Sequence, residues 1–245
     1  MNELPTVLGT IEAIYRYPVK SMRGESLPAA VLGWHGLECD RRFALRLLEA
    51  RGDFPWLNAS KFPELVLFTP LRAEGGSRDA PPVRVRLPEG EEVPLLGGAL
   101  AAEIRHRHGG PVEMAQLKHG MFDEASISVI TSTTTGEVCR LAGVREDIRR
   151  FRPNLVIRST RAVPFEEDDW VGGVLRFGEA GDAPALSVTQ RDLRCMMVNI
   201  DPDHGTLDHG VLKAVARANQ SNAGVYATVT GVGRVELGQR VMLHR

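Results

Sequence analysis

The chain of 245 residues contains only three cysteines, Cys39, Cys139 and Cys195, and no two of them form a Cys-x-x-Cys pair. Disulfide frameworks, zinc ribbons and protein-encoded iron–sulfur clusters need paired cysteines, so the spacing argues against all three. Long apolar runs are missing too: the longest are about five residues, whereas a membrane-spanning helix needs roughly 20. The first ten residues hold no apolar segment of signal-peptide length. The sequence therefore predicts a soluble, cytoplasmic protein with no membrane association.

Neither sign of charge is in excess, because 30 Lys and Arg residues face 31 Asp and Glu residues and leave a net charge of −1. A nucleic-acid-binding protein would show a basic excess or a basic stripe, so no nucleic-acid partner is expected. Lysine itself is scarce, and nearly all basic residues are arginines. Arginine presents fixed, planar, permanently charged donors, which suit the binding of anions.

Apolar and polar residues alternate in twos along most of the chain, a pattern typical of strands. Two segments have helical spacing instead, 132–141 and 208–219, the second with Asp208 as a possible N-cap. Many short strands separated by Gly and Pro predict a mainly β fold, a β-barrel or sandwich-like domain carrying a few helices. Near residues 118–123 the pattern changes from short strands and turns to strands with helices between them. This change divides the chain into predicted domains over 1–120 and 121–245. The predicted strands lie over 9–19, 42–48, 65–68, 83–87, 103–108, 112–117, 126–130, 155–157, 174–177, 186–189, 225–230 and 235–243.

Two motifs of the first half carry candidate anion-binding residues. Lys20 and Ser21 end the run YPVKS, where a cation and a hydroxyl at a strand exit can hold a phosphate; an ordinary surface lysine would leave the same pattern. Arg41 and Arg42 precede a strand in the run DRRF. One of them must point inward if the strand alternates. A buried arginine needs an anionic partner, which Asp40 or a ligand could supply.

Two motifs of the second half are candidates for binding a larger ligand. The run FRPN contains Arg152 and Asn154, and Pro153 favours an extended Arg152. The guanidinium and the amide could then bind a planar ligand rich in oxygen and nitrogen; a capped loop entering a strand is the alternative. Beside Arg194, Cys195 could be held as the thiolate that ligates a soft metal, although a lone cysteine in a strand is often an inert apolar residue.

Three further features favour ordinary structural roles. The acidic run 166–169 is predicted to be a solvated loop, and the run DPDHG over 201–205 a turn. His106 and His108 are expected on the solvated face of a strand.

Taken together, these motifs resemble those of the MOSC-domain family (molybdenum cofactor sulfurase C-terminal domain), preceded by its N-terminal β-barrel partner. The order YPVKS, DRRF, FRPN, RC and DPDHG, followed by a glycine-rich entry to a terminal strand with Tyr226, agrees over nearly the whole chain. The resemblance is closest to bacterial counterparts of the mitochondrial amidoxime-reducing component.

The resemblance implies one molybdenum–pyranopterin cofactor, whose metal Cys195 ligates as the catalytic residue. Relatives have Thr-Ser where Glu124 and Ala125 stand, so contacts to the cofactor there would come from the backbone. Leu193 replaces a serine of some relatives, which removes a polar contact. The residues expected around the cofactor are Lys20, Ser21, Arg41, Glu124, Ala125, Arg152, Asn154, Arg194 and Tyr226.

The activity implied by the resemblance is oxidoreduction: removal of oxygen from small N-hydroxylated substrates with two electrons and two protons. The chain has no GxGxxG followed by an acidic residue, so the electrons are expected from a separate electron-transfer protein. A sulfur carrier with a persulfide on Cys195, and a cofactor carrier or storage protein without turnover, remain as alternatives. Pyridoxal phosphate is not expected, because it needs a buried lysine and only Lys20 is suitably placed.

Overall fold

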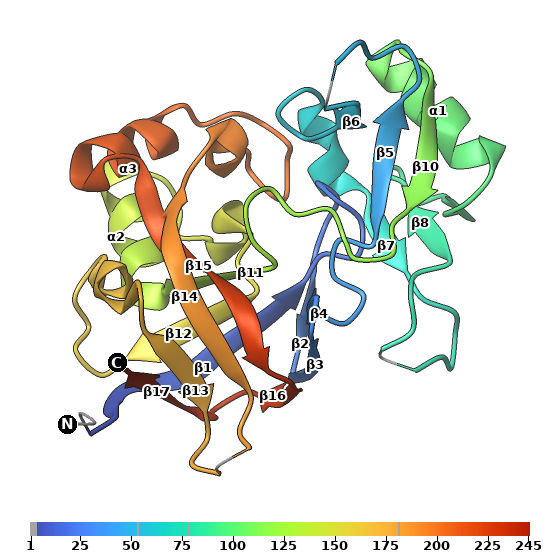
Figure 1. Ribbon diagram of the computed structural model, residues 1–245. Coiled ribbons are helices and arrows are strands. Elements are labelled where there is room, and N and C mark those ends of the chain that lie inside the picture. The colour runs from blue at the N-terminus through green and yellow to red at the C-terminus, as the bar shows by residue number, and fades with distance from the viewer. Residues whose placement is uncertain (1–3, 53, 78, 181) are drawn as a thin grey trace.

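The structure is a computed structural model that describes residues 4–52, 54–77, 79–180 and 182–245. Two parts are visible, a larger one built around a long curved sheet and a smaller one that carries helix α1 (Gly98–His108) (Figure 1). The described chain contains three α-helices among many short strands, which confirms the predicted mainly β fold with a few helices. None of its helices is both long enough and apolar enough to cross a membrane.

The larger part is a closed barrel. In the described residues its sheet has eight strands, and a pairing of the first strand in the order with the seventh closes the barrel, leaving the eighth attached outside the ring. Side chains of the ring fill the interior of the barrel. Ile11 and Ile14 of β1 (Thr6–Arg16) are buried with Ile157 and Leu155, their partners on β12 (Leu155–Ser159). The order around the sheet is β12 (Leu155–Ser159), β11 (Ile127–Thr131), β15 (Asn222–Gly231), β14 (Ala185–Leu193), β13 (Val174–Phe177), β17 (Arg240–His244), β1 (Thr6–Arg16) and β2 (Glu25–Leu27).

The smaller part has its own core, in which Phe43, Leu45, Phe68, Leu100 and Ile104 are buried. In a further small sheet, β3 (Ala29–Gly33) pairs with β4 (Gly36–Leu37) and with β16 (Gly233–Glu236). Strand β16 follows β15 and precedes β17 in the chain. The strands of these smaller sheets are β3 (Ala29–Gly33), β4 (Gly36–Leu37), β5 (Phe43–Leu47), β6 (Trp56–Leu57), β7 (Thr69–Leu71), β8 (Arg84–Arg86), β9 (Glu92–Pro94), β10 (Val112–Gln116) and β16 (Gly233–Glu236).

The hydrophobic cores of the barrel and of the smaller part do not follow a division of the chain at residue 120. Strand β1 pairs with β12 and β17, and Leu8, Leu27 and Leu32 share a core with residues beyond 120. The smaller core draws on 19–112 together with Ile200. The pairings of β1 with β12 and β17 join segments more than a hundred residues apart, and such pairings leave no local signal in the sequence. The division at residue 120 stays a sequence-based prediction.

Helices α2 (Ser132–Ala142) and α3 (Gly210–Asn219) pack together on one side of the barrel (Figure 1). The predicted helix over 132–141 is confirmed: the Thr131 hydroxyl accepts from the Thr134 N–H at 3.1 Å, and Gly143 ends the helix in the left-handed conformation. The second predicted helix is also present, but its N-cap is His209 without a side-chain bond. Asp208 instead pairs with Arg150 at 2.7 Å, so the N-cap prediction was wrong.

Two predicted strands are helical. Residues Pro63–Leu67 form the 3₁₀ helix η1, because a proline fits the first helical turn, where its missing N–H costs nothing. Residues 103–108 belong to α1, in which Leu100 and Ile104 lie one turn apart and are both buried. His106 and His108 therefore lie on a helix and not on a strand.

The acidic run is not a solvated loop. It forms the 3₁₀ helix η3 (Glu166–Trp170), in which Glu166 and Glu167 are buried. The Glu167 carboxylate accepts hydrogen bonds from the hydroxyls of Thr131 and Thr134, at 3.1 and 2.9 Å. Glu167 thus satisfies donors at the start of α2, whereas neither carboxylate oxygen of the buried Glu166 has a hydrogen-bond partner among the described residues. By contrast, the predicted turn over 201–205 is confirmed, since Asp201 accepts from the N–H groups of Asp203 and His204.

Candidate functional site

A cavity of about 420 Å³ lies between the barrel and the smaller part. Its lining includes Asn58 and Ser60 from the smaller part, with residues at the ends of β11, β14 and β15 from the barrel. Eight of the ten residues predicted around the cofactor and metal line it: Lys20, Ser21, Arg41, Glu124, Arg152, Arg194, Cys195 and Tyr226. The remaining two, Ala125 and Asn154, do not.

Lys20 and Ser21 reach the cavity from a turn after β1. The Lys20 N–H bonds the Phe43 carbonyl at 2.8 Å, and Ser21 adopts a φ of 68°, a conformation uncommon outside glycine. Lys20 is 5% exposed, and its ammonium donates to Asp123 at 2.6 Å. Burial lowers the pKa of Lys20 although Asp123 opposes the change. This lysine is therefore a largely desolvated cation whose neutralising partner sits on the neighbouring loop.

Arg41 is held by the fully buried Asp40, which is the partner that the sequence suggested. The Asp40 carboxylate also accepts from the Tyr17 N–H at 2.6 Å. A second nitrogen of Arg41 donates to the Arg152 carbonyl at 3.2 Å. Burial works against the charge of Arg41, but Asp40 raises its pKa above the usual value. Arg41 thus stays charged at the cavity wall.

Arg152 is not extended, so the prediction from the following proline was wrong. Its φ and ψ are 50° and 45°, because it caps the 3₁₀ helix η2 (Ile148–Phe151) and its N–H bonds the Arg149 carbonyl. The guanidinium lies 4.1 Å from the centre of the Tyr17 ring and donates to the Met22 carbonyl at 2.8 Å. Tertiary contacts therefore override the local preference, and burial lowers the pKa of Arg152 to about 10.

Asn154 lies behind the cavity wall and is 1% exposed. Its side-chain oxygen accepts from the Ser128 N–H at 3.1 Å, and its amide donates to Asp40 at 3.1 Å. With these bonds Asn154 fixes Asp40, and through it Arg41, against β11. It holds the site from behind and does not reach the cavity itself.

Arg194 and Cys195 follow the end of β14. The Arg194 guanidinium donates to the carbonyls of Ala223 and Phe151, at 2.6 and 2.8 Å, and pairs with Asp192 at 2.9 Å. Cys195 is exposed and begins the 3₁₀ helix η4 (Met196–Asn199). Cys39 and Cys139 do not line this cavity, so Cys195 is the one thiol that faces it.

Sequence reasoning missed an acid in the cavity wall, Asp192. Its carboxylate is 1% exposed and accepts from the Ser128 hydroxyl at 2.9 Å. Burial raises its pKa, against the opposing effects of Arg194, Ser128 and Tyr226. Strand β14 buries Asp192 after a register shift, with Gln190 exposed two residues earlier, so regular alternation in the sequence does not mark it.

Tyr226 on β15 and Glu124, which precedes β11 in the chain, both line the cavity. Tyr226 pairs directly with Ser128 across β15 and β11, and burial raises its pKa, so its hydroxyl stays protonated. Glu124 is exposed, and Ala125 lies outside the lining. The loop at 123–125 thus faces the cavity through Asp123 and Glu124.

The cavity is chemically suited to an anionic, polar ligand. Five cationic side chains line it, one of which, Arg150, is paired with Asp201 and Asp208. The lining also has four hydroxyls and three acids, namely Ser21, Ser60, Ser128, Tyr226, Asp123, Glu124 and Asp192. The described residues contain no group of three or more His, Cys, Asp or Glu that could hold a metal ion by themselves. A metal at Cys195 would therefore need further ligands from a bound organic group.

Two family models match the sequence: the MOSC domain over residues 105–242 and the MOSC N-terminal beta barrel domain over residues 8–119. No curated protein matches it. Among solved structures, the YuaD protein of Bacillus subtilis is similar over 100% of this chain and 98% of its own, with 13% identity and a TM-score of 0.53. YiiM of Geobacillus stearothermophilus is similar over 48% of this chain and 53% of its own, with 19% identity and a TM-score of 0.36. At these identities the likeness to YuaD concerns the fold alone.

Proposed function

The chain belongs to the MOSC-domain family, which is associated in general with the molybdenum cofactor, and from this premise we propose that it is a molybdenum-cofactor-dependent reductase of N-hydroxylated compounds. One observation carries the proposal: a single exposed thiol, Cys195, shares a cavity with a set of cationic side chains. These cations are Lys20, Arg41, Arg152 and Arg194, with Arg150 as a fifth that is already paired with Asp201 and Asp208.

The cavity fits the cofactor in volume and in chemistry. A volume of about 420 Å³ suits a small organic group. The phosphate and polar pterin of such a cofactor need charge-assisted donors, which lysine and arginine provide. The residues that would hold it are Lys20, Ser21, Arg41, Arg152, Arg194 and Tyr226, with backbone groups of Glu124 and Ala125 as further candidates and Asn154 acting through Asp40.

Cys195 would ligate the metal, because a thiolate is a soft ligand that suits molybdenum. When bound, the cofactor would supply two-electron redox chemistry for removing oxygen from an N–OH group. The protein's own share would be to bind and orient that cofactor and to hold its metal at the exposed Cys195, where substrate can reach the metal. Asn58 and Ser60 complete the cavity from the smaller part and give it polar groups for a small N-hydroxylated substrate.

Electrons would come from a separate electron-transfer protein, since the sequence has no dinucleotide-binding motif. A sulfur-carrier role for Cys195 is the second candidate, and the exposure of this thiol favours it. The cationic lining favours the reductase, because a persulfide needs no clamp for phosphate or pterin.

The test is to express the protein in a host that makes the cofactor, and to measure metal content and turnover of an amidoxime. We expect about one molybdenum per chain, no iron or zinc, and turnover with a chemical reductant but not with NADH or NADPH alone. Metal-free protein from a competent host, or cyanide-releasable sulfur in place of molybdenum, would refute the proposal.

A further inference from the structure

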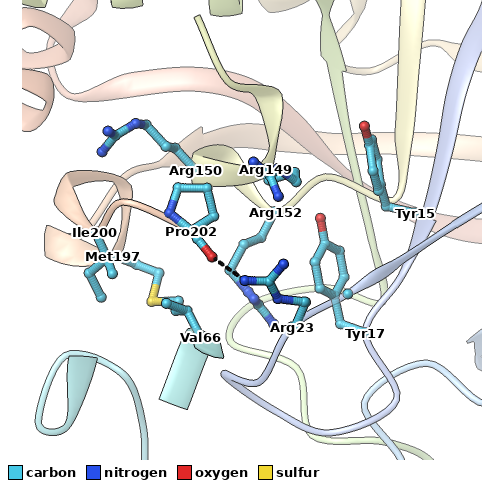
Figure 2. Close-up of a pocket in the computed structure, with 11 residues that line it drawn as sticks. Tyr15, Tyr17, Arg23, Val66, Arg149, Arg150, Arg152, Met197, Ile200 and Pro202 are labelled. Atoms are coloured by element: carbon cyan, nitrogen blue, oxygen red, sulfur yellow. Dashed lines mark hydrogen bonds between the residues drawn. The ribbon is translucent and has the colours of Figure 1, made fainter. Parts of the chain in front are cut away.

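A second, smaller cavity of about 30 Å³ adjoins the larger cavity of about 420 Å³ and shares Arg150, Arg152 and Met197 with it. Tyr17, Arg23 and Arg152 are among the residues that line it (Figure 2). Arg152 also lines the larger cavity, so its guanidinium stands between the two. Figure 2 shows Tyr17, Arg23 and Arg152 on one side of this cavity, and the Arg150 side chain extending away from them.

Each of these three side chains has a buried polar atom with no hydrogen-bond partner among the described residues. The atoms are the Tyr17 hydroxyl, Nε of Arg23 and Nη2 of Arg152. Other nitrogens of the same arginines are satisfied: Arg23 donates to the Pro202 carbonyl at 3.0 Å, and Arg152 to that of Met22 at 2.8 Å. Buried donors without acceptors are rare in folded proteins, because each carries a desolvation penalty. A fourth lining residue, Arg150, has a buried Nε of the same kind. Several such donors around one cavity indicate a missing acceptor.

The charge at this cavity points to an anion. Four arginines and no acidic residue are among its described lining residues. Arg149 and Arg150 are each paired with two aspartates. Arg152 has no ion pair with any described carboxylate, and the nearest carboxylate to Arg23, that of Asp203, is 3.6 Å away. Burial lowers the pKa of Arg152, which is the mark of a cation short of a counter-charge.

The number of donors and the volume limit the ligand. The volume holds roughly two waters at about 10–15 Å³ each. Two waters would satisfy all three donors but would leave the charge of Arg152 without a counter-ion. An oxyanion has enough lone pairs for all three donors and forms charge-assisted bonds with guanidinium groups. Arg23 is 34% exposed and provides the route from solvent.

We propose that this smaller cavity is a binding site for a free inorganic oxyanion, held by Arg23, Arg152 and the Tyr17 hydroxyl. The anion fixes Arg152 from the side opposite the larger cavity. This site is independent of the proposed reductase activity, because it needs neither metal nor substrate.

The test is calorimetric titration of cofactor-free protein with inorganic phosphate at constant ionic strength. Three variants separate the two cavities. Arg23→Gln removes a charge at the smaller cavity, Lys20→Gln removes one at the larger cavity, and Arg84→Gln is a matched surface control, since Arg84 is half exposed and pairs with Glu92. Tyr17→Phe removes only the hydroxyl and keeps the ring under Arg152.

We expect a phosphate site that survives in Lys20→Gln and Arg84→Gln, is weakened roughly 10- to 100-fold in Arg23→Gln, and is weakened about fivefold in Tyr17→Phe. Phosphate bound in the larger cavity is a separate component, which Lys20→Gln weakens and Arg23→Gln does not. Thermal melts establish that each variant is folded. Absence of phosphate binding, or binding lost in Lys20→Gln but kept in Arg23→Gln, would overturn the proposal. So would a crystal grown with phosphate that holds two waters in this cavity.

Discussion

The side-chain amide of Asn154 donates to the Asp40 carboxylate over 3.1 Å and so joins two motifs that lie 114 residues apart. Asp40 is fully buried and also binds the Tyr17 N–H and the Arg41 guanidinium. One carboxylate therefore fixes three segments around the wall of the cavity.

We expect Asp40→Asn to destabilise the fold strongly, because it leaves Arg41 with an unpaired charge in a mostly buried position. Removing one partner of a buried ion pair costs roughly 3–5 kcal/mol. Denaturant unfolding measures this loss. The matched control is Glu113→Gln, which breaks the exposed pair with Arg46 and should cost less than about 1 kcal/mol. Equal losses in the two variants would contradict the role given to Asp40.

Cofactor retention should depend on Arg152 far more than on Arg84. Losing one charge-assisted partner of a bound anion costs about 1.5–3 kcal/mol, or roughly 10- to 100-fold in affinity. Arg152→Ala should therefore lower the molybdenum and pterin content of purified protein, while Arg84→Ala leaves both unchanged. Equal occupancy in the two variants would place the cofactor elsewhere.

The buried Glu167 should make stability depend on pH. Burial raises its pKa to about 7, from an ordinary value of about 4.3. The folded state then holds a proton that the unfolded state releases, so this contribution is present below pH 4 and is lost as pH rises towards 7. The loss amounts to about 3 kcal/mol.

Glu167→Gln keeps the hydrogen-bonding shape of the neutral acid and removes the titration. The free energy of unfolding of the wild type, compared with that of this variant, should fall between pH 4 and pH 8. Glu113→Gln again serves as the exposed control. A difference between wild type and Glu167→Gln that stays constant over this range would show that Glu167 does not titrate there.

Local signals in the sequence were sufficient for part of the fold. Helix α2 was predicted because its start has a hydroxyl cap and its end has Gly143, both within a few residues of the helix. Helix α1 was missed because alternation over 103–108 imitates a strand, while the pair that is buried, Leu100 and Ile104, follows helical spacing. The place of β1 in the barrel depends on partners near residues 157 and 242, which no local pattern reveals.

The candidate site follows the same division. Eight of its ten predicted residues line one cavity. They were predicted from the order of the motifs along the chain, which indicates which segments lie together in the fold. The conformation of Arg152 was wrong, because a rule for the residue before proline takes no account of the Tyr17 ring beneath it. Asp192 was missed because a single acid in a strand gives no motif to recognise.

Catalysis is expected to depend on Cys195 and on neither of the other thiols. Cys195→Ser replaces a soft ligand with a hard one and leaves the arginine and lysine contacts to the cofactor in place. The variant should stay folded, keep at least part of its cofactor and lose N-reductive activity. Cys39→Ser and Cys139→Ser should retain activity, since neither residue lines the cavity.

The measurement that tests the central claim most directly is X-ray absorption at the molybdenum edge, on loaded wild-type protein and on loaded Cys195→Ser. If Cys195 binds the metal, the variant should show one sulfur neighbour fewer around molybdenum and one more oxygen or nitrogen neighbour. An identical sulfur count in the two proteins, or a sample without molybdenum from a cofactor-competent host, would contradict the account.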